Sequence, residues 1–326
     1  MPAHQPFKTH PALRSRIFSG YGFTDCITQS YLATVGLLIL IFHNDRVPTW
    51  PVMAAWHVAG LLAIHLLIRL QARFQHSLAL DFLRHFYPIL LYTALYHETG
   101  LLNQLFGLGY LDASFFRMEQ SLFGWQPGIE LMQRFPQRGL AELLLASYFC
   151  YYLMVGGVGL ALFLRNRRQF DHFLAVISFV FYVCYFIYIF TPVVGPRILL
   201  PGVVAPLPDG LQQWPVPTTP LPVQEALFFR LMAWIYANFE VPGAAFPSSH
   251  VAVALATAWF SFRYLRPIRW LHLGVALLLC IATVYGRYHY VIDVLAGIAT
   301  AVVLVPAGNW LHRKFSGAPP ADSSRN

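Results

Sequence analysis

The sequence predicts an all-α integral membrane protein, a polytopic bundle of about eight transmembrane helices. Of its 326 residues, 57% are hydrophobic and only 11% are charged, whereas a soluble domain averages about 25% charged residues. Apolar stretches long enough to cross a bilayer recur along the whole chain. Lysine and arginine are also distributed unevenly between alternate connecting loops, as the positive-inside rule requires of a membrane protein.

The spans follow from the requirement for about 20 largely apolar residues per crossing. The third candidate is the least apolar, because it contains His85, His97 and Glu98. Residues 1–24 are polar and lack the apolar stretch of a cleavable signal peptide, so we expect the first span to be retained. The eight segments are 25–43, 50–70, 82–98, 141–164, 171–191, 248–265, 268–286 and 289–311.

The distribution of positive charge predicts the orientation. If the N-terminus is cytoplasmic and all eight segments cross, fifteen of the 22 lysines and arginines face the cytoplasm and seven face the other side. Cytoplasmic loops carry the excess of positive charge in membrane proteins. Both termini are therefore expected in the cytoplasm, and the long loops 99–140 and 192–247 outside it.

These loops suggest three regions. Residues 1–140 comprise three spans and an apolar, aromatic loop that is expected to form an interfacial or re-entrant element. Residues 141–312 form the expected catalytic membrane core, and 313–326 a polar tail. Within the core, residues 192–222 are proline-rich, and a helical pattern follows before Pro242.

The composition argues against a nucleic-acid partner and against a disulfide or zinc site. The net charge of +8 comes from residues scattered at span ends, not from a basic stripe with aromatics, so no nucleic-acid partner is expected. The cysteines form no CxxC pair and are expected to pack as small hydrophobic residues, without a disulfide or zinc site. They are Cys26, Cys150, Cys184 and Cys280.

Three short polar stretches lie at span ends that the predicted topology places on the extracytoplasmic face. They are Gly195-Pro196-Arg197, residues 246–250 (FPSSH) and residues 286–293 (GRYHYVID). In the third, His289 and Asp293 are four residues apart and would share one face of a helix. The carboxylate would orient the imidazole and leave its other nitrogen free to act as a nucleophile. An ionisable pair at a span end is costly unless it is used or well paired.

The other two stretches supply what a phosphate needs. Ser248 and Ser249 are good helix-starting residues, and the N–H groups at a helix N-terminus bind anions. His250, in the first turn, would face that anion and could protonate a leaving oxygen. Arg197 and Arg287 would bind the remaining phosphoryl oxygens.

The pair P-S-S-H and H-x-x-x-D, about forty residues apart and each at the start of a span, resembles the type 2 phosphatidic acid phosphatase superfamily. The resemblance covers about residues 190–300. It implies that His289 forms a phosphohistidine, that Asp293 orients it and that His250 protonates the leaving group. It also implies that no metal and no other cofactor is required.

The chain departs from the phosphatase members of that superfamily in all three motifs, with Ser249 in place of the glycine of their second motif, P-S-G-H. Their K-x6-R-P is absent, since Lys8 and Lys314 are the only lysines, and Thr283 stands where the third motif usually has an arginine. These features look more like the inositol phosphorylceramide synthase branch, as does the segment 122–127 (LFGWQP) that follows Asp112 and Glu119. That branch includes many bacterial proteins, which implies a bacterial inner or plasma membrane.

The expected function is therefore transfer of a phosphoryl or phospho-headgroup from a membrane lipid to a polyol or lipid alcohol. The acceptor site is expected to involve His97, Glu98, Asp112 and Glu119. Equally, these residues could lie on the solvated face of an interfacial helix without a role in the reaction. Transfer to water, which would make the protein a lipid phosphate phosphatase, stays open.

Two other classes also stay open. A proton-coupled lipid transporter would use the histidines as a relay and would be expected to show inverted repeats, which we do not see. A haem or quinone protein would use His57 and His65. For the motif residues the simplest alternatives are structural: serines that only cap a helix, and span-end arginines that only extend to the interface.

Overall fold

The computed structural model describes residues 18–316, which are helical apart from turns, loops and one isolated β-bridge between Val193 and Ala244. All eight predicted segments coincide with long helices, so the all-α membrane fold is confirmed. The eight are α1 (Phe23–Phe42), α2 (Trp50–Arg73), α3 (Leu78–Leu102), α6 (Arg138–Arg165), α7 (Arg167–Phe190), α10 (Ser249–Tyr264), α11 (Arg269–Tyr285) and α12 (Val291–Ser316).

Six of the described helices are long and apolar enough to cross a membrane: α1, α2, α6, α7, α11 with the short turn before it, and α12. The chain is thus an integral membrane protein. The remaining two predicted spans are α3, which contains Asp81, Arg84 and Glu98, and α10, which has only 16 residues. The total of eight crossings stays a prediction.

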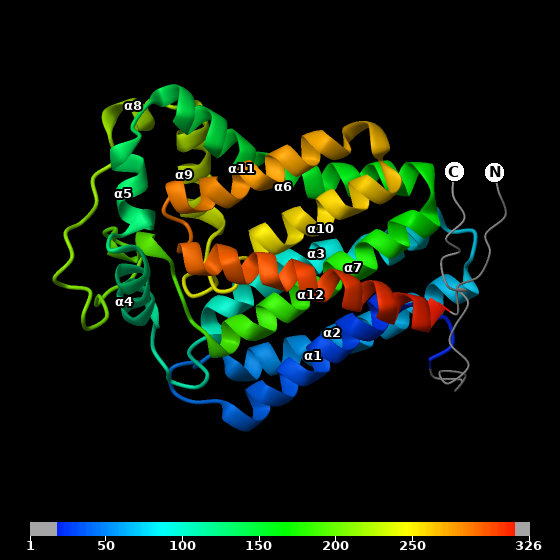
Figure 1. The fold of residues 1–326 in the computed structure, drawn as a ribbon. Helices are drawn as coiled ribbons and strands as arrows, with labels where there is room; N and C mark the ends of the chain where they lie inside the picture. The colour runs from blue at the N-terminus through cyan, green and yellow to red at the C-terminus, as the bar shows by residue number, and fades with distance from the viewer. Residues whose placement is uncertain (1–17, 317–326) are drawn as a thin grey trace.

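The long helices run alongside one another, and the shorter ones gather at one end of the bundle (Figure 1). These are α4 (Asp112–Phe123), α5 (Pro127–Arg134), α8 (Leu221–Gln224) and α9 (Leu227–Phe239). They lie opposite the end at which α12 finishes. The two long loops of the sequence therefore build one layer across a single end of the bundle.

Helix α7 is the centre of the bundle. It packs against α1, α3, α6, α10 and α12, and 72% of its most apolar window is buried, compared with 28% for α2. Its buried face is made of aromatic, β-branched and small residues from Phe170 to Ile189. Around it, α10 and α12 pack together, as do α6 and α11. The helices that carry the second and third motifs are thus anchored on the most buried of the six apolar spans.

The helix boundaries extend the predictions for the two loops and differ from the prediction for both ends of α12. The apolar loop after α3 folds into α4 and α5, and the helical pattern after Pro222 forms α9, as predicted. Helix α12 begins at Val291, so His289 lies in the turn after α11 and not on the helix. Of the predicted polar tail, residues 313–316 continue α12, and 317–326 lie outside the described residues.

Candidate active site

The three motifs meet at the end of the bundle covered by the short helices. The Arg197 N–H donates to the carbonyl of Arg287 at 3.1 Å, and the Ser248 N–H donates to the carbonyl of Asp293 at 3.0 Å. Gly195 has φ +93°, and a Cβ there would lie 2.4 Å from the Tyr288 carbonyl oxygen. Only glycine allows this approach, so the first motif depends on Gly195 to reach the third.

His289 and Asp293 lie side by side, although not on one helix as expected. His289 Nδ1 is 3.4 Å from Asp293 Oδ2, and the same carboxylate oxygen accepts the Tyr290 N–H at 2.8 Å. The turn that contains His289 brings its ring back over the first turn of α12. His289 is 3% exposed and Asp293 is fully buried, so the pair is shielded from solvent.

The second motif starts α10 as predicted. Ser248 is the N-cap, and its Oγ accepts the Val251 N–H at 3.3 Å. The same oxygen lies 3.2 Å from His289 Nε2. Ser249 also takes part in fixing this turn, since its N–H donates to the Tyr188 hydroxyl at 3.2 Å. The helix N-terminus is thereby held directly against the ring nitrogen that faces away from Asp293.

His250, in the first turn of α10, is the second histidine of the site. Its ring centroid is 5.8 Å from that of His289. The ring packs against Tyr148 and Tyr151, with centroid distances of 5.2 and 4.9 Å. The tyrosines of α6 therefore fix the orientation of His250 relative to His289.

Arg197 brings the guanidinium of the first motif to this region. It is 9% exposed, stacks on the Tyr236 ring at 5.2 Å and forms an ion pair with Glu240. Burial raises the pKa of Glu240 to about 8, although Arg197 opposes the shift. Glu240 was not among the residues predicted from the sequence. Its only signal was one carboxylate directly after an apolar helix and a few residues before the second motif.

Polar atoms without partners gather around these residues. Buried polar atoms in proteins are nearly always hydrogen-bonded, yet twelve buried side-chain atoms of the described residues lack a partner. Five of them belong to this site: Arg197 Nε, Glu240 Oε2, His250 Nδ1, Asp293 Oδ1 and His289 Nδ1, which lies 3.4 Å from Asp293 Oδ2 without forming a hydrogen bond. Such a concentration is what a binding site for a polar group requires.

Arg287 points elsewhere. Its terminal nitrogens contact the proline-rich loop, with the carbonyl of Thr218 at 2.6 Å and that of Pro217 at 3.4 Å. Its backbone has a positive φ of 66°, which turns the chain between α11 and His289. The expected phosphate contact of Arg287 stays a prediction; in this structure the residue ties the third motif to the loop.

Helix α4 supports the motifs from the side. Asp112 is fully buried and accepts the Val194 N–H at 3.0 Å, the Gly195 N–H at 2.9 Å and the Tyr290 hydroxyl at 2.9 Å. Burial raises the pKa of its carboxyl to about 7. One residue of α4 thus joins the first motif to the third.

Glu119 acts two turns further along the same face. It accepts the N–H of Val291, the first residue of α12, at 2.6 Å. Burial raises its pKa to about 7 as well. Both carboxylates were expected at an acceptor site. Here they hold backbone of the first and third motifs, and their acceptor role stays a prediction.

The remaining two expected acceptor residues lie in α3. Glu98 pairs with His57 Nε2 at 2.9 Å, and the other ring nitrogen of His57 contacts the Leu32 carbonyl at 2.8 Å. His97 is partly buried beside Tyr96. His65 Nδ1 contacts the Tyr21 hydroxyl at 2.7 Å. Both ring nitrogens of His57 are thus engaged within the protein.

The comparisons with known proteins agree with this geometry. Residues 113–307 match the model of a family described as the PAP2 superfamily. The chain belongs to the PAP2 superfamily. The match contains all three motifs of this PAP2 protein and begins in α4, so its chemistry falls in the lipid phosphatase and phosphotransferase class. Comparisons with curated proteins and with solved structures found no match.

Within residues 18–316, no group of three or more histidine, cysteine, aspartate or glutamate side chains is arranged to hold a metal ion.

Proposed function

We propose that this PAP2 protein transfers a phosphoryl or phospho-headgroup from a lipid-linked phosphate through a phosphohistidine at His289. One observation supports this above the others. His289 has Asp293 3.4 Å from one ring nitrogen and Ser248, at the α10 N-terminus, 3.2 Å from the other, with the His250 ring 5.8 Å away. A nucleophile, an orienting carboxylate, an anion-binding helix end and a proton donor are then in one place.

In the first half-reaction, Asp293 holds the proton on Nδ1 of His289, so Nε2 carries the lone pair. Nε2 attacks phosphorus, the N–P bond forms and the P–O bond to the leaving group breaks. His250 gives its proton to the departing oxygen. In the second half, His250 takes a proton from the acceptor hydroxyl, whose oxygen attacks phosphorus and breaks the N–P bond.

Charge stabilisation is assigned to Arg197 and to the N-terminus of α10. Arg197 is the guanidinium that the backbone of the first motif places beside the third, and its Nε is buried without a partner. Preorganised donors of this kind stabilise the charge that develops on the equatorial oxygens. No metal is assigned a role, and we expect orthovanadate to inhibit the protein and EDTA not to.

The acceptor is proposed to be an alcohol, as in the inositol phosphorylceramide synthase branch. Support comes from the first motif, Gly195-Pro196-Arg197, and from the missing lysine of the phosphatase pattern. The alternative acceptor is water, which would make the protein a phosphatase acting on phosphatidate or a polyprenyl phosphate. Both readings share the first half-reaction.

The site is proposed to face away from the cytoplasm, because the charge distribution places the three motifs there. The chain would then lie in a bacterial inner or plasma membrane with both termini in the cytoplasm. Substrate would reach His289 from the outer leaflet.

The test is phosphate release from a panel of phospholipids and polyprenyl phosphates in detergent, with and without inositol or a lipid alcohol. Release by wild type but not by His289→Ala would establish a phosphatase. Headgroup exchange that needs the added alcohol would establish the transferase. Lipid transport that survives His289→Ala, with no turnover of any donor, would favour the transporter class instead.

A further inference from the structure

A polar cavity lies at the end of the bundle opposite His250 and His289. It occupies about 330 Å³ between the α6–α7 turn and the α10–α11 turn, and is lined by Arg165, Gln169, Arg263, Tyr264, Arg266 and Pro267. The 16 residues of α10 separate it from the proposed active site by about 24 Å. It is therefore not part of that site.

Three arginines line this cavity and no carboxylate does. The ion pairs near this end involve other residues, such as Arg84 with Asp25 and Arg167 with Asp81. Among residues 18–316, no carboxylate forms an ion pair with Arg165, Arg263 or Arg266. Like charges brought together without a counter-charge repel one another. The cavity is thus built for an anion.

The walls of the cavity are fixed by bonds that reach into the bundle. Arg263 Nε donates to the Tyr264 hydroxyl at 3.2 Å, and this hydroxyl lies 2.7 Å from His172 Nδ1. His172 Nε2 lies 2.6 Å from Asn309 Oδ1 in α12. In addition, the Oε1 atom of Gln169 is buried without a partner. It offers an acceptor to a ligand that carries a hydroxyl as well as a phosphate.

The surrounding surface indicates the source of the anion. Three exposed tryptophans, Trp259, Trp270 and Trp310, lie on the helices at this end. Arg263 contacts the Trp259 ring at 5.6 Å, and Lys314 contacts the Trp310 ring at 5.3 Å. Tryptophan gathers at the level of the lipid headgroups, and basic cavities between helices at this level bind anionic headgroups. A membrane lipid therefore fits better than a soluble anion.

We propose that this cavity binds the phosphate of an anionic phospholipid with a hydroxylated headgroup, in the leaflet opposite the active site. Arg165, Arg263 and Arg266 bind the phosphate oxygens, and Gln169 accepts a headgroup hydroxyl. The inference is independent of the proposed reaction, because its readout is binding and not turnover.

The experiment measures the binding of phosphatidylglycerol, phosphatidylcholine and inorganic phosphate to the purified full chain in detergent, by native mass spectrometry. The test variant is Arg165→Gln/Arg266→Gln, which changes two exposed side chains. The matched control is Arg73→Gln/Lys314→Gln, which removes two charges from the same end outside the cavity. We expect the test variant to bind phosphatidylglycerol about tenfold more weakly or worse, and the control to stay within about twofold of wild type.

Three results would overturn the proposal. An equal loss in both variants would mean that the end of the bundle attracts anionic lipid only diffusely. Equal affinity of wild type for phosphatidylcholine would remove the role of net negative charge. Displacement by inorganic phosphate of a weakly held phosphatidylglycerol would make the cavity a site for free phosphate.

Discussion

At the scale of single residues, the site depends on a few buried charged side chains and on the groups with which each of them pairs. Asp293 serves His289 and the Tyr290 N–H, whereas Arg197, which is proposed to bind the phosphate, pairs with Glu240. A phosphoryl group that binds Arg197 must therefore compete with a carboxylate already there. We therefore expect Glu240 to lower the affinity for phosphate without taking part in the chemistry.

The raised pKa of Glu240 predicts that inhibition by orthovanadate depends on pH. Its pKa is raised to about 8, so below that pH it binds a proton and competes weakly for Arg197, and above it the ionised carboxylate competes fully. We predict that the inhibition constant of orthovanadate rises severalfold as pH passes from about 7 to about 9. In Glu240→Gln the rise should be much smaller. The measurement is inhibition against pH for both proteins.

The exposed carboxylate of Glu225 offers the control, since Glu225→Gln should leave the wild-type profile intact. Equal profiles for wild type and Glu240→Gln would mean that Glu240 does not compete for Arg197.

Residue chemistry was the part of the site most accessible from the sequence. His250, His289, Asp293 and Arg197 could be selected because histidine, aspartate and arginine are costly at span ends and therefore stand out. Glu240 could not, because its meaning depends on a contact with Arg197, 43 residues away. The direction of the Arg287 side chain could not be predicted either, because it depends on the fold of the loop at 217–219.

At the scale of elements, α4 connects the two halves of the site. The apolar character of residues 99–140 predicted an interfacial element, and helices α4 and α5 form there. The role of α4 could not be predicted, because it depends on the contact between Asp112 and Tyr290, which are 178 residues apart in the chain. Helix starts were easier: Ser248 was recognised as a cap because serine in that position satisfies free N–H groups locally.

The two carboxylates of α4 predict how stability varies with pH. Burial raises the pKa of Asp112 from 3.8, and that of Glu119 from 4.5, to about 7. Between about pH 4 and pH 7 the folded chain holds protons that the unfolded chain has released, so stability falls as pH rises through this window. The Asp112→Asn/Glu119→Gln variant should lose much of this slope.

The check is the midpoint of thermal unfolding in detergent at several pH values from 5 to about 8. A wild-type midpoint that rises over this range, or a variant that keeps the full wild-type slope, would contradict the assignment.

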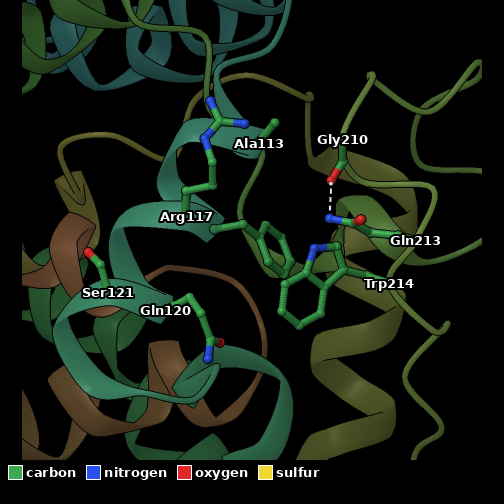
Figure 2. A pocket seen from close by; sticks show the side chains of 8 residues that line it. Ala113, Arg117, Gln120, Ser121, Gly210, Gln213 and Trp214 are labelled. Carbon is green, nitrogen blue, oxygen red and sulfur yellow. Dashed lines mark hydrogen bonds between the residues drawn. The ribbon is translucent and has the colours of Figure 1, made fainter.

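A second feature of α4 is the open pocket it forms with the loop after η2 (Pro196–Leu199). Figure 2 shows Arg117, Gln120 and Ser121 on one side and Gln213 and Trp214 on the other. The Trp214 ring packs on Phe116, which in turn contacts Tyr290 of the third motif, with centroid distances of 5.3 and 5.5 Å. The outer layer is thus continuous with the inner site.

At the scale of the whole molecule, apolar length and positive charge predicted the bundle, because both are set by the bilayer and not by tertiary contacts. Helix α3 is not among the six most apolar helices, and two of its charged side chains pair inside the protein. Arg84 pairs with Asp25, and Glu98 pairs with His57. A helix with its charges paired in this way can cross a membrane although its composition is less apolar.

Sidedness tests whether α3 crosses. Three of the predicted spans, α3, α6 and α7, lie between the exposed positions 73 and 209, so the eight-span topology puts these positions on opposite sides. Asp209→Cys and Arg73→Cys are each made in a background with the native cysteines replaced by alanine. An impermeant maleimide should label position 209 in intact cells, and position 73 only after permeabilisation. Labelling of both in intact cells, or of neither, would mean that α3 does not cross.

The central claim is that His289 carries the phosphoryl group, and it is tested most directly by trapping the intermediate. Wild type, His289→Ala and Asp293→Asn are mixed briefly with the labelled donor that supports turnover and quenched in alkali. We predict that wild type retains an acid-labile, base-stable label on one peptide that contains His289. Asp293→Asn should accumulate it about 10³-fold or more slowly, and His289→Ala should not acquire it. Undiminished label in His289→Ala, or turnover by that variant at the wild-type rate, would contradict the account.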